Sequence, residues 1–145
     1  MTYVSETLRR TVAARASNCC EYCLIPQDSK LFTFEVDHII AEKHRGATRE
    51  DNLCLSCIDC NRHKGSDFAS FDPESDAIAL LFNPRRERWI DHFLLNGALI
   101  ESVTPTGRVT VFLLQINDES RVSERAALIE ARRYPPPEFP LWRTA

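Results

Sequence analysis

The stretch CIDCNRHK, Cys57 to Lys64, decides which fold the chain adopts. Its C-x-x-C spacing is typical of a tight turn that points two thiolates at one metal ion. Cys20 and Cys23 have the same spacing earlier in the chain. Asn61 follows the second pair without a spacer, although an asparagine is a poor zinc ligand. Four thiolates are what a tetrahedral structural zinc site requires, and we predict one from Cys20, Cys23, Cys57 and Cys60.

Two further cysteines make the ligand assignment ambiguous. Cys19 cannot begin a C-x-x-C motif, because Tyr22 stands three residues later. Cys54 forms a second C-x-x-C with Cys57, but it alternates with leucines on an expected strand, where a small buried thiol is the simpler interpretation. The alternative for the four predicted ligands is that they are free thiols in the core.

Length and composition favour a single compact domain over residues 1–145. Of the residues, 43% are hydrophobic and 27% charged, and no apolar run is long enough to span a membrane. The N-terminus lacks the apolar core of a signal peptide, so we expect a cytoplasmic protein without a membrane partner. Six cysteines in such a protein are metal ligands more often than disulfides. With a net charge of −3, the chain would have to bind nucleic acid through a local basic surface and metal ions.

Local patterns predict a hairpin followed by a helix in the middle of the chain. Ser5 is a candidate N-cap for a first helix that ends near Asn18. Residues 31–40 are rich in β-branched and aromatic side chains and predict a strand. A polar loop with Gly46 as its turn residue, a return strand over 52–56, and a helix from Ile58 that ends before Pro73 complete the region.

The second half of the chain predicts a mixture of helices and strands. Residues 84–95 suit a short amphipathic helix or a strand edge, and we predict the helix. Asn96-Gly97 predicts a turn and residues 98–103 a strand. Thr104 and Pro105 resemble a helix start, although residues 106–116 also fit a strand. Asp118 is a candidate cap for a last helix, and the proline-rich stretch from Tyr134 predicts an extended tail.

The run VDHIIAEKHRGATREDNLCLSCIDCNRHKG, residues 36–65, resembles the HNH endonuclease family. Together with the first cysteine pair, the resemblance covers about a third of the chain. Its specific features are the Asp-His pair, the Asn-Leu before the return strand, the cysteine–asparagine junction and the lysine after it. Arg45 departs from the family, because many members have there the first glycine of a Gly-Gly turn. Asn61 replaces the last histidine of the family name, which is a common variant.

This resemblance implies an α+β fold with a ββα-metal core, treble-clef-like and of the His-Me finger type, stapled by the four-cysteine zinc site. The core would cover about residues 18–72, after an N-terminal helix. A mixed strand and helix extension would cover about residues 78–145.

The same resemblance implies roles for four residues. His38 would be the general base, Asp37 and Asn61 would hold a catalytic divalent ion, and Asn52 would brace the loop. Coordination chemistry agrees with this division, because Mg²⁺ or Mn²⁺ prefers carboxylate and amide oxygens and leaves an imidazole free to accept a proton. Without the resemblance, a lone Asp-His pair is more often a surface aspartate beside a half-buried histidine.

Helix geometry explains how Asn61 can follow a zinc ligand directly. Successive helix residues are turned by about 100°, so Cys60 can face the zinc while Asn61 faces the hairpin. The candidates for nucleic-acid contacts are Lys64, Arg62, His44, Arg85 and Arg86. The plainer interpretation is a solvated side chain for Lys64, Arg85 and Arg86, and an ordinary loop histidine for His44.

We therefore expect a metal-dependent endonuclease that hydrolyses DNA phosphodiester bonds with structural zinc and catalytic Mg²⁺ or Mn²⁺. A non-catalytic zinc module that binds nucleic acid or protein is the alternative, and an iron-binding redox protein is a second. The triplet of Asp37, His38 and Asn61 argues against both, because neither needs it. The sequence does not identify a protein partner, nor does it distinguish DNA from RNA or single from double strands.

Overall fold

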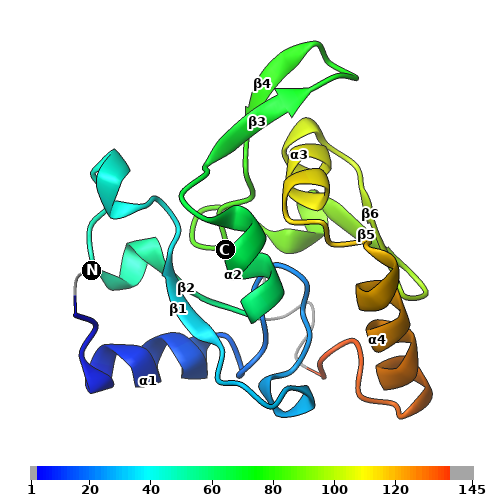
Figure 1. Cartoon of the computed structure of the whole chain (residues 1–145), viewed down its shortest axis with the longest axis horizontal. Coiled ribbons are helices and arrows are strands. Elements are labelled where there is room, and N and C mark those ends of the chain that lie inside the picture. The colour runs from blue at the N-terminus through cyan, green and yellow to red at the C-terminus, as the bar shows by residue number, and fades with distance from the viewer. Residues whose placement is uncertain (1–2, 138–145) are drawn as a thin grey trace.

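The computed structural model describes residues 3–137 and has a mixed α+β architecture. Its centre is a two-stranded antiparallel hairpin followed at once by a helix, as the sequence predicts (Figure 1). These elements are β1 (Glu35–His38), β2 (Leu53–Ser56) and α2 (Ile58–Lys64). In this register Asp37 lies opposite Cys54 and His38 opposite Leu53. The hairpin therefore ends where the Asp-His pair stands.

The first helix, α1 (Glu6–Arg15), packs against the hairpin from the N-terminal side. It begins where the sequence predicts, because the Ser5 side chain accepts a hydrogen bond from the backbone N–H of Leu8. At its last turn, Arg15 donates hydrogen bonds to the carbonyls of Glu50 and Leu53. These bonds tie the helix to the start of β2.

The predicted strand over residues 31–40 is wrong at both ends, since β1 covers only Glu35–His38. Before β1, the Gln27 side chain hydrogen-bonds the carbonyl of Phe32 and the N–H of Phe34, so this backbone has a partner other than a strand. Leu31 is 98% exposed, which confirms that no sheet covers it. After β1, both backbone polar groups of Ile40 bond to a side chain of the loop instead.

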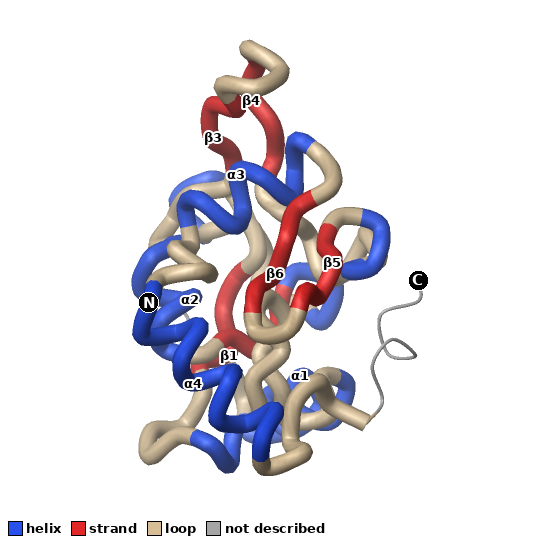
Figure 2. Tube along the Cα trace, turned by 90° about the vertical axis from the view of Figure 1, so that its right-hand side faces the viewer, coloured by secondary structure: helices blue, strands red, loops and turns tan. Residues whose placement is uncertain are grey.

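A second hairpin, which the sequence analysis missed, follows α2. It consists of β3 (Ala69–Asp72) and β4 (Ala77–Leu80), and it stands out from the body of the molecule (Figures 1 and 2). Its turn forms because Asp72 accepts hydrogen bonds from the backbone and hydroxyl groups of Ser75. From the sequence alone, Pro73 indicates only the end of a helix.

The predicted helix over residues 84–95 is also wrong. This segment contains a 3₁₀ turn, Trp89–Asp91, and then β5 (Phe93–Asn96), which pairs with β6 (Leu99–Ser102). The local backbone is held by side chains, because Asn83 accepts from the Arg85 N–H and Glu87 accepts from the Asn83 N–H. The turn over Asn96-Gly97 and the strand after it are confirmed.

Two helices complete the described chain, α3 (Pro105–Leu113) and α4 (Glu119–Glu130). Residues 105–113, for which the sequence leaves helix and strand open, form a helix. The Thr104 hydroxyl caps it by accepting from the Gly107 N–H, and Pro105 is its first residue. Asp118 is the N-cap residue of α4 but makes no side-chain bond to the helix backbone. The predicted tail begins at Tyr134, and from residue 138 onward it lies outside the described residues.

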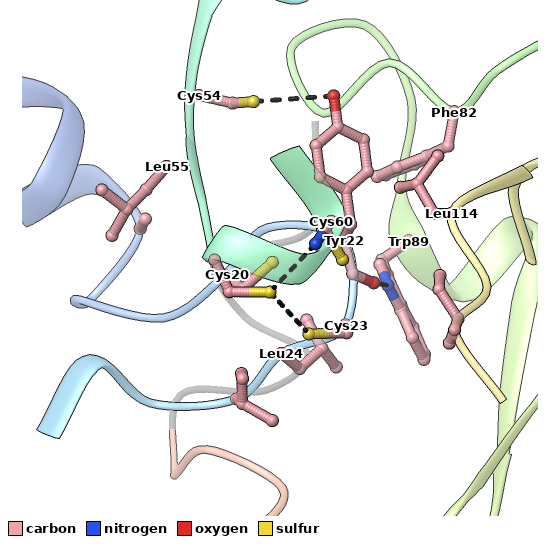
Figure 3. Close-up of a cluster of buried hydrophobic side chains, with 14 of the residues drawn as sticks. Cys20, Tyr22, Cys23, Leu24, Cys54, Leu55, Cys60, Phe82, Trp89 and Leu114 are labelled. Atoms are coloured by element: carbon pink, nitrogen blue, oxygen red, sulfur yellow. Dashed lines mark hydrogen bonds between the residues drawn. The ribbon is translucent and has the colours of Figure 1, made fainter. Parts of the chain in front are cut away.

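The buried core draws on both halves of the chain. Trp89 is fully buried and donates its indole N–H to the carbonyl of Tyr22, between the first two cysteines of the predicted zinc site (Figure 3). Phe82 and Leu114 lie around the same point. Within the described residues, no helix is long and apolar enough to cross a membrane.

Candidate metal centre and active site

The four predicted zinc ligands come together in the core. Their sulfur atoms all lie within 4.8 Å of one another, and all four residues are fully buried. The Sγ atoms of Cys23 and Cys57 are 3.7 Å apart. Sulfurs bound to one tetrahedral zinc at about 2.3 Å are separated by about 3.8 Å, so the cluster has the donors and the size of a zinc site.

The local backbone conformation places the two sulfurs of each cysteine pair on the same side of a turn or helix start. The first pair lies on a short turn in which the Leu24 N–H donates to the carbonyl of Cys20 and Leu24 takes a positive φ of 70°. In the second pair, Cys57 is the N-cap residue of α2, and its sulfur accepts from the Cys60 N–H at 3.4 Å. The remaining cysteines lie elsewhere: Cys54 contacts the Tyr22 hydroxyl (Figure 3), and Cys19 the carbonyl of Ser17.

Arg121, on α4, covers the cluster from the C-terminal half. Its Nη2 lies 2.9 Å from Cys60 Sγ and 3.8 Å from Cys57 Sγ, and Nη1 donates to the carbonyl of Leu114 at 2.7 Å. The residue is only 5% exposed. A zinc ion with four thiolates has a net charge of −2, so a buried guanidinium offsets part of it and orients the sulfurs. The Tyr134 hydroxyl adds a bond to the carbonyl of Cys23.

Asp37 and His38, at the end of β1, form the second site. His38 Nε2 lies 2.8 Å from the Thr48 hydroxyl and 3.8 Å from a carboxylate oxygen of Glu42. Both β1 side chains are mostly buried, with 13% of Asp37 and 15% of His38 exposed. Burial raises the pKa of Asp37 above its ordinary value, and the neighbouring ammonium of Lys64 partly opposes that rise.

Lys64 joins α2 to this strand end. Its Nζ donates to the His38 carbonyl at 3.0 Å and lies 3.1 Å from Asp37 Oδ2. The latter contact is an ion pair without hydrogen-bond alignment, so Asp37 Oδ2 has no hydrogen-bond partner among the described residues. Asn61, one turn before Lys64, is half-buried, and its side chain makes no hydrogen bond within the described chain. A carboxylate and an amide oxygen suit a hard divalent cation, which would take its other ligands from water and phosphate.

The loop between β1 and β2 is held by Asn52. Its side chain accepts from the Ile40 N–H and donates to the carbonyls of Ile40 and Ala47, all at 2.9 Å. Gly46 lies so close to the Ile40 carbonyl that a Cβ atom would collide with it. The left-handed residue of the turn is Arg45, with φ of 73°, so Gly46 is needed for close approach instead of for its backbone angle.

Residues 20–67 match the family model described as HNH endonuclease. The match covers 48 of the 145 residues, and we call this segment the HNH domain. The match contains all four clustered cysteines, the Asp-His pair and Asn61, and it ends just before β3. The search of curated proteins found no match, and neither did the search of solved structures.

The expected nucleic-acid contacts differ in accessibility. Arg62 and His44 of the HNH domain and Arg86 beyond it are exposed. Lys64 is 1% exposed and held by β1, which corrects the expectation of a surface lysine. Arg85 is corrected too, because it forms an ion pair with the buried Glu21 and only 12% of its side chain is exposed.

Sequence reasoning missed two residues that contact the sites of the HNH domain. Thr48 gives no signal beyond its place in a polar loop. Arg121 lies 61 residues after the cysteine it contacts, and its helix pattern reads as solvated. Only packing brings either residue to its site.

Proposed function

We propose that the protein is a metal-dependent endonuclease that hydrolyses phosphodiester bonds of DNA, with zinc in the four-cysteine cluster. The observation that carries the proposal is the meeting of α2 with the end of β1. There a buried carboxylate oxygen of Asp37 has the Lys64 ammonium as its only partner among the described residues, next to His38 in the chain. Asn61, whose amide is unbonded within the described chain, lies one helical turn before Lys64 on α2. A module that only binds nucleic acid or protein has no need for a buried carboxylate, an imidazole and an unbonded amide gathered at one helix end.

In this proposal Asp37 and Asn61 hold a divalent ion. When bound, the ion would offset negative charge on the phosphate and on the leaving 3′ oxygen. Because Asp37 is mostly buried, its carboxylate is poorly solvated and a bound cation would stabilise its charge. Lys64 supplies positive charge next to the same carboxylate. Asn52 holds the loop that carries Thr48, the hydroxyl partner of His38.

His38 accepts the proton of the attacking water. If its Nε2–H donates to the Thr48 hydroxyl, Nδ1 is the unprotonated nitrogen and the base. This assignment requires a neutral ring. Thr48 thus acts as a positioning residue in the proposal.

The test is plasmid cleavage by purified protein with Mg²⁺ or Mn²⁺, compared across three variants. His38→Ala should fold and bind metal normally but lose about 10²- to 10⁴-fold of its activity. Asp37→Ala and Asn61→Ala should weaken the divalent ion, so high Mn²⁺ should restore part of their activity and none of the activity of His38→Ala. Wild-type cleavage rates in His38→Ala would overturn the assignment of the base. No cleavage by the wild type with either ion would favour the binding-module alternative.

A further inference from the structure

The β3–β4 hairpin carries an apolar face that nothing in the described structure covers. Residues directly opposite in an antiparallel pair share a face, and here Phe71 lies opposite Ile78, and Ala69 opposite Leu80. Of these side chains, Phe71 is 49%, Ile78 69% and Leu80 62% exposed. We call these four residues the hairpin face.

The other face of the same hairpin is anchored to the body. Asp72 is buried and receives two hydrogen bonds from the Arg108 guanidinium of α3, both at 3.0 Å. The hairpin is therefore held in one orientation by its polar side, and its apolar side is turned away from α3. An apolar surface held outward is typical of a binding surface.

The hairpin face borders a groove, whose lining from β4 is Leu80 of that face and Ala79 of the opposite face. Leu80 belongs to both, and the groove runs from the end of β4 to the loop after β1 and to residues 83–87. Its volume is about 680 Å³, within the range of roughly 300–1,000 Å³ found for ligand sites. Phe68, also on its wall, packs edge-on against His44 of the HNH loop, with ring centroids 4.9 Å apart. We call it the loop–hairpin groove.

Cationic side chains dominate the polar part of the loop–hairpin groove. Arg45 and Arg86 are exposed there and make no ion pair or side-chain hydrogen bond with the described residues. Arg49 is exposed as well and pairs only with its near neighbour Asp51. In a chain whose net charge is −3, free arginines beside an apolar face indicate an anionic occupant with apolar parts.

We propose that the loop–hairpin groove and the hairpin face bind a single-stranded segment of nucleic acid. Phosphates would lie along Arg45 and Arg86, and unpaired bases would stack on Phe71 and pack on Ile78. A duplex presents phosphates and polar base edges to a protein, whereas the flat faces of bases become available only in unpaired strands. The apolar hairpin face matches those base faces. This inference rests on the proposed function in taking nucleic acid as the substrate, and it narrows that substrate to unpaired strands or frayed duplex ends.

The experiment measures binding without cleavage. A fluorescein-labelled 12-nucleotide DNA of mixed sequence, alone or annealed to its complement, is titrated with His38→Ala protein in buffer without divalent ion or chelator. The variant Phe71→Ser/Ile78→Ser is compared with Leu94→Ser/Leu99→Ser, which removes two exposed leucines from the β5–β6 hairpin. All four positions are exposed, so the variants should keep the fold and the zinc content.

We expect Phe71→Ser/Ile78→Ser to weaken binding of the single strand by about 10-fold or more and binding of the duplex much less. The control Leu94→Ser/Leu99→Ser should change neither affinity. Replacing Arg45 and Arg86 by alanine should reduce the slope of log affinity against log salt by about 1.4, since each single-strand phosphate contact contributes about 0.7. The matched control, Arg10→Ala/Arg132→Ala, removes the same charge outside the groove and should leave the slope unchanged.

Equal losses for single and double strands, or equal losses in the leucine control, would overturn the inference. Unchanged nucleic-acid affinity in Phe71→Ser/Ile78→Ser would also overturn it and would point to a protein as the occupant. Because binding is measured in a protein without the proposed base, the result is independent of whether the wild type cleaves.

Discussion

The two sites of the HNH domain differ in how many protein groups contact their metal-donor atoms. At the cysteine cluster every sulfur is buried, and an arginine, a backbone N–H and a tyrosine-bound carbonyl surround the donors. At the end of β1, by contrast, a carboxylate oxygen has no hydrogen bond and the Asn61 amide has no partner among the described residues. A closed donor set suits a scaffold metal, and an open one suits a metal that must also bind substrate. α2 begins at the first site and ends at the second.

The largest effect should come from breaking the closed site. Cys60→Ser removes one of four ligands, and structural zinc contributes roughly 10–16 kcal/mol in small zinc domains, so we expect loss of zinc and of cooperative folding. Elemental analysis and thermal unfolding measure both. The matched control is Cys54→Ala, which removes a buried thiol outside the cluster and should keep one zinc per chain. A folded, zinc-loaded Cys60→Ser would contradict the ligand assignment.

The second-largest effect should come from replacing Arg121, which contacts the cysteine sulfurs. Arg121→Met removes a buried charge beside the sulfurs and should cost about 3–5 kcal/mol of unfolding free energy, measured in urea. Zinc release to a coloured chelator should be faster, and Arg121→Lys should recover part of the loss.

Arg125→Met is the control on the same helix. Arg125 is equally buried but bonds to Ala98 and Asn117, away from the cysteines. It should lower stability without faster zinc release. Equal release rates in the two methionine variants would place Arg121 outside the metal site.

At the open site we expect a smaller change from Thr48. Thr48→Val keeps the shape but removes the hydroxyl next to His38 Nε2, and one hydrogen bond contributes about 1 kcal/mol, so activity should fall by about 3- to 10-fold. Thr48→Ser should restore it. Nitrogen-15 NMR of the His38 ring reports the tautomer directly, and an unchanged tautomer in Thr48→Val would remove Thr48 from the proposed mechanism.

The smallest effect concerns the ion pair between Asp72 and Arg108, which anchors the β3–β4 hairpin, and its dependence on pH. Hydrogen bonds from Arg108 and Ser75 lower the pKa of Asp72 below its usual range. A lowered pKa in the folded state contributes stability above the ordinary carboxyl pKa of about 3.9, and that stability is lost as pH falls toward the lower folded value.

Asp72→Asn should therefore be less stable than the wild type at pH 7, and the difference should narrow between about pH 4 and pH 2. Urea midpoints measure this change. Asp76→Asn, in the same turn, removes an exposed carboxylate that makes no ion pair or side-chain hydrogen bond with the described residues, and it serves as the control. A difference that is constant with pH would show that the ion pair does not anchor the hairpin.

The sequence by itself determined the elements whose signals are local. Two C-x-x-C pairs identify the four clustered cysteines, and the cap residue Ser5 locates the start of α1. Thr104 and Pro105 indicate the start of α3, although the residues after them also fit a strand. Spacing and capping act within a few residues, so they can be read before the chain folds. The roles of Asp37, His38 and Asn61 stay predictions, because they came from the family resemblance.

Only the tertiary structure decided which side chains surround each site and which of them stay accessible. Lys64 and Arg85 read as solvated cations but are buried against Asp37 and Glu21, while Arg45 and Arg86 remain free. Residues 84–95 fit a helix by periodicity, yet Trp89 is drawn into the core against Tyr22 and Phe93 pairs in a strand. These ion pairs and core contacts join residues that lie 26 to 67 positions apart in the chain. A local sequence pattern spans only a few residues, so it carries no information about such contacts.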